Sequence, residues 1–377
     1  MFTLNEEQQM LKDAAKSFLQ EQAPVTRFRK MRDAGKDGWD EALWKEMVEM
    51  GWTGILVPED FGGSGLGYLG IGVVLEEAGR TLAASPLLST ALIGASALVL
   101  GGNDAQKSQY LPKIVDGSAI FALAVDEGPH HNPAKTALKA EKAGAGYKLT
   151  GKKSYVADGH LANTLIVAAR TSGKPGDTQG ITLFLVPADA KGVTRTTLKT
   201  VDSRGAADIA FQGVEVGADS VLGGVDAGGA LLDQVLDRAR VGLAAEMLGH
   251  STQSFEITND YLKTRVQFGQ PIGSFQALQH RAAKMFTDIE LTRSCVIAAL
   301  DALDENRNDV AELASVAKAR AGDTIHVVSN EMVQMHGGIG MTDEFDIGFY
   351  MKRARAAETS FGDLSFHGDR LARMLGY

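Results

Sequence analysis

The chain has 377 residues, which exceeds the size at which one hydrophobic core keeps growing, so two or three packed units are expected. Its formal net charge of -9 argues against a nucleic-acid partner, because phosphate neutralisation needs clustered Lys and Arg. The single cysteine, Cys295, excludes an intrachain disulfide and is expected to be a small core residue. The start of the chain has neither a basic segment nor an apolar signal core, and no apolar stretch is long enough to span a bilayer. The sequence therefore predicts a cytoplasmic protein with no membrane span.

The first 118 residues carry a helical pattern. Apolar residues between Leu4 and Leu19 recur at three- and four-residue spacings, and Asn5 with two glutamates supplies an acidic start. A second helix is predicted from about Trp39 to Met50, and the proline and glycines of Val57–Gly67 then predict a loop. Further helices are expected at 70–84, 86–100 and 105–116.

Residues 119–228 change to short β-type runs that are separated by turn residues. Turns are expected at 142–146 and 173–177. The predicted strands are 120–125, 147–149, 154–156, 164–168, 181–186, 193–198 and 209–216.

From residue 229 to 377 the helical pattern returns, with long amphipathic segments at 231–265, 275–303 and 310–336. Helices of this length favour an up-and-down bundle. The predicted fold class is therefore α+β, with an N-terminal helical domain at 1–118, a middle β-barrel-like domain at 119–228 and a C-terminal four-helix bundle at 229–377.

Two segments have residues suited to binding a ligand. The glycines of Gly337–Gly340 permit close approach to a phosphate, although a helix C-cap followed by a turn explains them as well. Arg265 and Phe268, between two long helices, suit a pyrophosphate and an aromatic ring, or else a solvated arginine and a loop anchor. His130–His131 is expected to be a polar loop, and no metal-ligand spacing is present.

Four motifs in this order resemble signatures of the acyl-CoA dehydrogenases, and together they cover essentially the whole chain. The resemblance extends to the small-subunit type of pimeloyl-CoA dehydrogenase and to related bacterial members that work in heteromeric pairs. The motifs are Val57–Gly63, Gly151–Gly159, Arg265–Gly269 with Gln276 and His280, and Gln334–Gly340.

The resemblance implies an FAD held between the β-domain and the C-terminal helices, with a neighbouring subunit completing the site. It places Arg265 at the pyrophosphate and Phe268 near the adenine, with Gln276, Gln334 and Gly338 contributed by the facing subunit. The flavin ring would rest on two strands of the β-domain. The full set of implied FAD residues is Leu123, Val125, Asp126, Tyr155, Val156, Ala157, Arg265, Phe268, Ile272, Gln276, Gln334, Gly337 and Gly338.

Two departures from the family pattern bear on flavin binding. The usual Thr-Glu-Pro-Gly-x-Gly-Ser loop is replaced by Asp126–Pro133, and Ala157 stands where a hydroxyl residue is expected near flavin N5. Backbone groups remain able to bond the flavin ring, but contacts of this loop with pyrophosphate and substrate are not expected to follow the family.

The implied reaction is FAD-dependent α,β-dehydrogenation of an acyl-CoA, in which a carboxylate removes the Cα proton while a hydride leaves Cβ for flavin N5. The two positions that usually hold the glutamate carry Phe361 and Ala239 here, and neither can accept a proton. Asp363 is the first candidate replacement and Glu246 the second, while Glu358 is expected to be a surface charge.

Three functional readings remain open on the sequence. The first is an enzyme that acts alone or in a heteromer, and the second is a catalytically silent subunit that binds flavin or stabilises a partner. The third is a flavin oxidase or monooxygenase on the same fold. The resemblance also implies an electron-transfer flavoprotein as electron acceptor and a homo- or hetero-oligomer, a dimer or a tetramer.

Overall fold

The computed structural model describes residues 4–36, 38–177 and 179–377. Its N-terminal part is helical, and α1 is capped by Asn5, whose side chain accepts a hydrogen bond from the amide of Gln8 while the amide of Asn5 donates to Oε1 of Gln8. The helices of this part are α1 (Glu6–Gln22), α2 (Val25–Asp33), α3 (Glu41–Glu49), α4 (Gly67–Thr81), the π-helical η3 (Leu87–Gly94), α5 (Ala95–Gly101) and α6 (Asp104–Val115).

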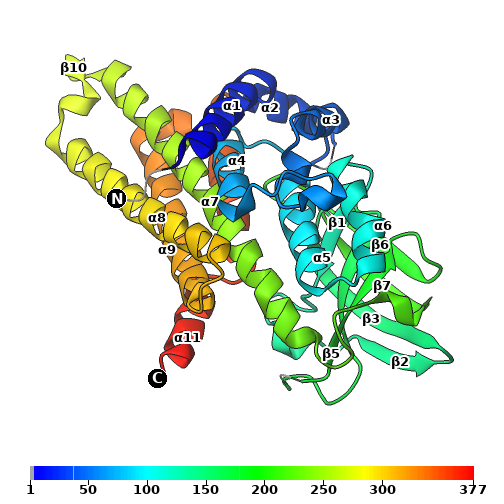
Figure 1. The fold of residues 1–377 in the computed structure, drawn as a ribbon. Coiled ribbons are helices and arrows are strands. Elements are labelled where there is room, and N and C mark those ends of the chain that lie inside the picture. The colour runs from blue at the N-terminus through cyan, green and yellow to red at the C-terminus, as the bar shows by residue number, and fades with distance from the viewer. Residues whose placement is uncertain (1–3, 37, 178) are drawn as a thin grey trace. The chain divides into compact units, whose positions relative to one another are not determined.

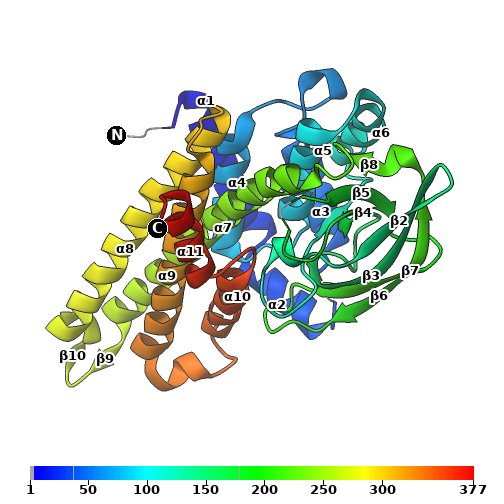
Figure 2. The same ribbon diagram turned by 90° about the horizontal axis from the view of Figure 1, so that it is seen from below.

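The middle part forms a sheet in the order β6-β7-β3-β2-β4-β5-β8, with β1 pairing in parallel with β4 (Figure 2). Strands β4 and β5 are almost wholly buried and carry apolar runs, whereas the buried residues of β3 recur at every third or fourth position. The strands are β1 (Phe121–Ala124), β2 (Lys139–Ala143), β3 (Gly146–Ala157), β4 (Thr164–Arg170), β5 (Ile181–Pro187), β6 (Val193–Leu198), β7 (Ala206–Val216) and β8 (Val221–Leu222).

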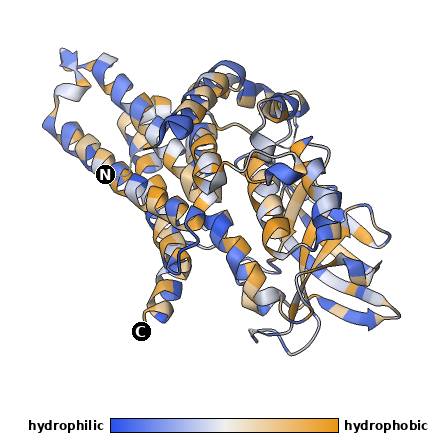
Figure 3. Cartoon of the chain, in the orientation of Figure 1, coloured by the Kyte–Doolittle hydropathy of each residue, from blue (hydrophilic) through white to orange (hydrophobic). Residues whose placement is uncertain are grey.

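The C-terminal part is helical again, with a short two-stranded hairpin between its first two helices (Figure 1). Hydrophobic and hydrophilic residues recur side by side along most helices, as expected where one face of a helix is covered (Figure 3). The elements are α7 (Gly228–Thr264), β9 (Val266–Gln267), β10 (Gln270–Pro271), α8 (Gln276–Asp304), α9 (Val310–His336), η7 (Gly337–Met341), α10 (Ile347–Thr359) and α11 (Leu364–Met374).

The chain packs as two units. The helical unit contains residues 4–30, 68–83 and 240–377, and the sheet unit contains the described residues of 31–67 and 84–239. Helix α7 belongs to both, since its first turns lie in the sheet unit and the rest in the helical unit. No helix among the described residues is long and apolar enough to cross a membrane.

The predicted architecture of helices, sheet and helices is confirmed, and the structure corrects several elements. The strands predicted at 147–149 and 154–156 are one strand, β3, with β-bulges in its pairing with β7. Strands β2 and β8 are absent from the sequence prediction, and the loop of Val57–Gly67 holds a short 3₁₀ helix at Glu59–Phe61. Cys295 is half-buried rather than part of the core, and burial raises the pKa of its thiol.

In the helical unit, α4 and α7 approach each other at two glycines. A Cβ on Gly79 would lie 2.0 Å from the backbone oxygen of Glu246, and a Cβ on Gly249 would lie 1.7 Å from that of Glu76. Only residues without a side chain permit this backbone contact. The two glutamates therefore sit at the crossing of the two helices.

Glu76 connects three helices of this unit. Its carboxylate accepts hydrogen bonds from Lys12 Nζ on α1 and from Arg293 Nη1 on α8, each at 2.7 Å. Burial by itself raises the pKa of Glu76, but the two cations outweigh burial and hold that pKa below its usual value. The ionised carboxylate thus stabilises the packing of α1, α4 and α8.

We predict that Glu76→Gln lowers the free energy of unfolding by about 2 kcal/mol at neutral pH, because two partly buried cations lose their anion. The pKa of Glu76 is lower in the folded protein than in the unfolded chain. The stabilisation by Glu76 is therefore fully present at pH values above its unfolded-state pKa, and it is lost as the pH falls through its folded-state pKa. Urea titrations at about pH 7 and pH 3 should show the difference between parent and variant shrinking at acid pH.

The matched control is Glu41→Gln, which breaks an ion pair with Lys45 whose side chains are 64% and 69% exposed. Solvent screens an exposed pair of this kind, so its loss should change the free energy of unfolding much less than Glu76→Gln does. Equal losses in the two variants would contradict the role given to Glu76.

Candidate functional site

In the sheet unit, the structure brings together the end of β1 and the end of β3. The amide of Ser154 donates to the oxygen of Asp126 at 2.8 Å, and Lys153 Nζ donates to the oxygen of Val125 at 2.8 Å. Lys153 is fully buried and pairs with Glu127 at 2.7 Å. Burial lowers the pKa of Lys153, and Glu127 opposes this shift. The strand ends that carry the predicted flavin-ring residues are therefore adjacent and firmly held.

The predicted residues on these strand ends differ in exposure. Leu123, Val125 and Val156 are buried, so their side chains belong to the core of the unit. Tyr155 is 48% exposed and Ala157 is exposed. Tyr155 also has a left-handed φ of 51°, a conformation that a bulky residue adopts only when its surroundings impose it. The surface that this edge offers to a ligand therefore consists of Tyr155, Ala157 and backbone groups.

The loop after β1 is organised by its own carboxylates. Asp126 Oδ2 lies 2.8 Å from Nδ1 of His131, and Asp126 Oδ1 accepts the amide of Asn132 at 3.0 Å. Glu127 accepts the amides of Ala137 and Leu138 at 2.9 and 3.0 Å. These three amides are satisfied within the chain, so they are not offered to an external phosphate. His131 therefore lies in a polar loop, as the sequence predicts, and its ring contacts the carboxylate of Asp126.

In the helical unit, Arg265 and Phe268 lie on the hairpin between α7 and α8. Phe268 is 92% exposed and, with Gly269, has a left-handed φ, as a two-residue hairpin turn requires. The guanidinium of Arg265 is exposed and has no side-chain partner within residues 4–36, 38–177 and 179–377. Ile272 follows the hairpin, its amide donating to the oxygen of Arg265 at 2.8 Å, and Gln276 is the exposed first residue of α8.

The glycine turn lies against the same end of α7. The rings of Tyr261 and His336 stack with centroids 4.2 Å apart, and this contact joins the end of α7 to the end of α9. Gln334 is exposed on the last turn of α9, and Gly337 follows with a φ of 64°. A Cβ on Gly338 would meet no atom within 4 Å, and no left-handed φ requires glycine there. The packing of the subunit itself therefore does not explain this glycine.

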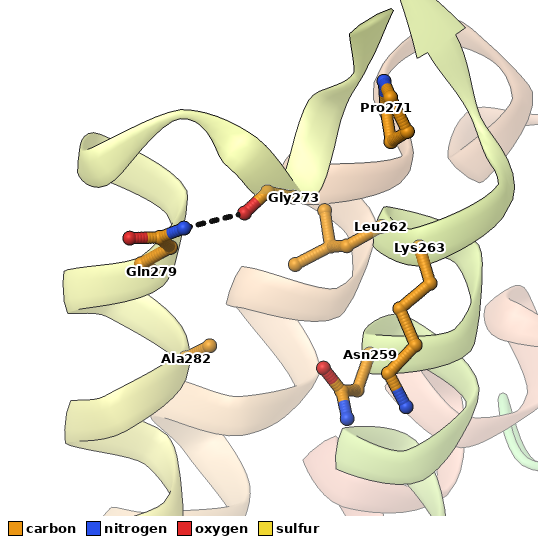
Figure 4. A pocket seen from close by; sticks show the side chains of 7 residues that line it. All are labelled: Asn259, Leu262, Lys263, Pro271, Gly273, Gln279 and Ala282. Carbon is orange, nitrogen blue, oxygen red and sulfur yellow. Dashed lines mark hydrogen bonds between the residues drawn. The ribbon is translucent and has the colours of Figure 1, made fainter.

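A pocket of about 400 Å³ lies below the hairpin, between α7 and the start of α8 (Figure 4). Gln279 on its α8 wall donates to the oxygen of Gly273 at 2.9 Å, so its amide is engaged in closing the pocket. The lining holds no acidic residue and none of the predicted site residues, and it consists of Asn259, Leu262, Lys263, Pro271, Gly273, Gln279 and Ala282. The lining therefore has no carboxylate that could abstract a proton.

The three carboxylates considered as bases all have partners in the helical unit. Asp363 is exposed and caps α11, its Oδ1 accepting the amide of Phe366 at 2.8 Å. Glu246 is 7% exposed and pairs with Arg353 at 2.8 Å. Glu358 contacts two cationic or ionisable side chains, His326 and Arg355, at 3.0 and 2.9 Å. Ala239 is fully buried in α7 and Phe361 is half-buried.

A buried basic cluster that sequence reasoning missed surrounds the turn between α10 and α11. Arg240, Lys318 and His367 are each 1% exposed. Burial and then Arg240 lower the pKa of Lys318 to about 7, against the opposing effect of Asp363. Burial, Arg240 and Lys318 lower the pKa of His367 to about 2, so its ring is neutral. The sequence signal is a lysine between Ala317 and Ala319, which does not distinguish a buried lysine from one that reaches solvent.

Three family models match the chain in order: the acyl-CoA dehydrogenase N-terminal domain at residues 5–118, the middle domain at 126–214 and the C-terminal domain at 226–376. Mitochondrial isovaleryl-CoA dehydrogenase of Pongo abelii is 34% identical over 95% of this chain and 86% of its own length. Butyryl-CoA dehydrogenase from Megasphaera elsdenii has a TM-score of 0.92 at 27% identity, covering 100% of this chain and 99% of that one. A chain of the ChsE4-ChsE5 complex from Mycobacterium tuberculosis has a TM-score of 0.91 at 27% identity, covering 100% and 98%.

We predict that Gly362→Ala lowers the free energy of unfolding by about 2 to 4 kcal/mol, because a side chain is strained and crowded there. Gly362 has a φ of 105°, and a Cβ would lie 2.3 Å from Phe366 Cδ1 and 2.9 Å from His367 Nε2. The control, Gly368→Ala in α11, meets nothing within 4 Å and should stabilise by about 0.5 to 1 kcal/mol. Thermal and urea unfolding measure both, and a neutral Gly362→Ala would contradict the packing described for this turn.

Proposed function

Because the chain belongs to the acyl-CoA dehydrogenase family, whose members are FAD-binding oxidoreductases, we propose that it removes hydrogen from Cα and Cβ of an acyl-CoA thioester. The observation that carries the proposal is the match of all three family domains, in order, over nearly the whole chain. We also propose the domain boundaries 1–118, 119–228 and 229–377. A cytoplasmic location stays a prediction from the sequence.

The residues of the helical unit fit the pyrophosphate and adenine parts of FAD. The exposed guanidinium of Arg265 and the open space beside Gly338 are features that the subunit's own packing does not use. The ring of Phe268 meets Phe275 edge-to-face, with centroids 6.0 Å apart, and stays 92% exposed. A planar guanidinium suits bidentate contact with a diphosphate, and an aromatic face suits an adenine. We propose that these three, with Ile272, Gln276, Gln334 and Gly337, hold the nucleotide half of the cofactor.

The residues of the sheet unit fit the flavin ring less fully. Tyr155, Ala157 and nearby backbone groups form the exposed surface, while Leu123, Val125 and Val156 support it from below. Asp126 stands where the family has a hydroxyl residue, and its carboxylate is engaged by His131 and Asn132. Bound FAD would supply the hydride acceptor. We propose that this chain's own loop contributes orientation of the ring and little phosphate binding.

For the proton acceptor we propose Asp363 ahead of Glu246. Asp363 is exposed and caps α11 through Oδ1, which accepts the amide of Phe366. Glu246 is buried and neutralised by Arg353, which favours a structural role. A base from a partner subunit is the remaining route to the same reaction.

The second candidate function is a silent subunit that binds flavin or stabilises a partner. It is favoured by Phe361 and Ala239, which leave both usual base positions without a proton acceptor. The similarity to a chain of the ChsE4-ChsE5 complex supports an assembly of unlike subunits, such as the heteromeric bacterial type resembling pimeloyl-CoA dehydrogenase. We propose an oligomer in either case, and an electron-transfer flavoprotein as acceptor in the catalytic one.

We predict that Arg265→Ala lowers FAD affinity ten- to a hundredfold, because charge-assisted contacts with a diphosphate contribute about 1.5 to 3 kcal/mol. FAD content of the purified protein and fluorescence titration of the apoprotein measure this. Arg265→Lys keeps the positive charge but loses the two parallel N–H donors of the guanidinium. Its FAD affinity should therefore lie between those of the parent and Arg265→Ala. Lys284→Ala, an exposed charge on α8, should leave affinity unchanged. Equal affinities in Arg265→Ala and the parent would remove Arg265 from the site.

We predict that Asp363→Asn abolishes flavin reduction by acyl-CoA while FAD binding and stability are kept. Asparagine caps a helix as well as aspartate does, so this change removes basicity and retains the cap of α11. General-base catalysis contributes about 10² to 10⁴ in rate, which stopped-flow absorbance resolves.

Glu246→Gln is the companion variant. It breaks a buried ion pair, so it should lower stability and leave the reduction rate near that of the parent. The reverse pattern would move the base to α7. A parent that binds FAD and shows no reduction with butyryl-, isovaleryl- or octanoyl-CoA, even with its partner subunit present, would favour the silent subunit.

A further inference from the structure

Near its end, strand β3 departs from regular pairing with its neighbour β7 (Figure 2). Two residues of β3, Ser154 and Tyr155, lie opposite one residue of β7, Asp208, with regular pairs on either side of them. This is a β-bulge, in which one strand holds an extra residue that the ladder does not bond. The amides of the bulged residues therefore need acceptors outside the ladder.

Both bulged residues find such acceptors within the sheet unit. The amide of Ser154 donates to the backbone oxygen of Asp126, which follows β1, at 2.8 Å. The amide of Tyr155 donates to Oδ1 of Asp208 at 3.0 Å. Asp208 is exposed, and its side chain supplies the acceptor that the backbone of β7 lacks at this point. The bulge is thus held by the segment after β1 and by a carboxylate of β7.

The bulge imposes an unusual backbone on exposed residues. Tyr155 has a φ of 51° and Asp158 a φ of 57°, so two left-handed residues other than glycine flank Ala157 and its neighbour. Aspartate tolerates this conformation, whereas a bulky tyrosine seldom adopts it. The ring of Tyr155 stays 48% exposed, so the packing of a buried ring does not explain the strain. Strain of this kind concentrates at functional sites.

The residues after the bulge are fixed by the π-helical η3. Ser89 of η3 is 4% exposed and donates from Oγ to Oδ2 of Asp158 at 2.6 Å. The next residue, Thr90, accepts the amide of Phe121 at the start of β1 at 3.0 Å. π-helices are rare and occur frequently at functional sites. One buried helix therefore supports both strands that carry the proposed flavin-ring residues.

Resting on the function proposed above, we propose that Asp208 and Ser89 are positioning residues that hold the bulge, so that the ring of Tyr155 and the backbone of Ala157 meet the flavin ring in one fixed orientation. Hydride transfer depends steeply on the distance and alignment of the reacting atoms. A displaced support therefore lowers the rate of reduction more than it lowers FAD affinity. The nucleotide contacts proposed for the helical unit do not depend on the bulge.

The experiment compares Asp208→Ala with Asp208→Asn in the full-length protein loaded with FAD. The side-chain oxygen of asparagine accepts the amide of Tyr155 as the carboxylate does, so only the alanine variant loses this bond. We expect Asp208→Ala to lower the kcat for butyryl-, isovaleryl- or octanoyl-CoA by about tenfold or more, with little change in KM or in FAD affinity. Asp208→Asn should retain a rate close to that of the parent.

The matched control is Glu215→Ala, which removes another exposed carboxylate from β7 and should change none of these quantities. Ser89→Ala tests the second contact and should also slow reduction. Its control is Ser251→Ala, a buried serine that bonds the backbone of its own helix, α7. Equal rates in Asp208→Ala and the parent would exclude Asp208 as a positioning residue. An equal loss in Asp208→Ala and Asp208→Asn would assign the effect to charge and would also overturn the proposal.

Two further measurements need no turnover. In Asp208→Ala without added FAD, the amides of residues 154–159 should exchange with solvent about tenfold faster than in the parent or in Asp208→Asn. With FAD bound, the visible absorption bands of Asp208→Ala should move toward those of free FAD, while Asp208→Asn keeps the parent spectrum. If both differences are seen in a protein that no acyl-CoA reduces, the proposed function fails and the positioning of the ring stands. Unchanged exchange and an unchanged spectrum would overturn the positioning, whatever the activity of the parent.

Discussion

The close approach of Gly79 and Gly249 to the backbone of the facing helix is the constraint on which the helical unit depends. Each glycine lies against a backbone oxygen of the other helix, so α4 and α7 meet with no side chain between them. This crossing fixes where Glu76 and Glu246 lie, and each glutamate then recruits cations from neighbouring helices. Near its C-terminal end, α7 also places the ring of Tyr261 against His336 of α9. A backbone contact at one point thus sets the positions of groups along a helix of 37 residues.

Three carboxylates that are buried or partly buried in the helical unit form ion pairs that stabilise its packing. Glu76 and Glu246 are paired with cations, and Glu358 contacts His326 and Arg355. Catalysis needs a base whose pKa and position suit proton abstraction, and a carboxylate locked in a buried ion pair meets neither need. Asp363 stands apart because it is exposed and its cap can be made by a neutral amide. The difference between a catalytic and a silent member of this family can therefore lie in very few side chains.

The candidate cofactor residues divide in a way that bears on assembly. The sheet unit offers an edge of Tyr155, Ala157 and backbone, with its loop amides already occupied by Asp126 and Glu127. The helical unit offers an exposed guanidinium and an exposed phenyl ring at the tip of a hairpin. Exposing an aromatic ring to water on a strained turn is unfavourable in an isolated subunit. A ligand or a second chain that covers the ring would remove this unfavourable exposure. This supports a site shared between subunits.

The sequence by itself determined the order of helices, sheet and helices, and it gave several bounds closely, including the whole of α9 at Val310–His336 and β6 at Val193–Leu198. Hydrophobic periodicity and glycine or proline breaks are local signals, so they are readable without a structure. The four motifs likewise placed the family, whose three domain models match the chain.

Only the tertiary structure decided what depends on distant partners. Strand β2, Lys139–Ala143, is made of lysine, alanine and glutamate, residues with little preference for strands, and it exists because β3 pairs with it. Lys318 gives no local sign of being buried, and its pKa of about 7 arises from burial and from Arg240, which lies on another helix far away in the sequence. Arg240 and Lys318 also bond backbone oxygens of the turn that contains Phe361, whose φ is left-handed. Pairing and burial are properties of the folded chain, and for that reason the partners of these residues could not be read from the sequence.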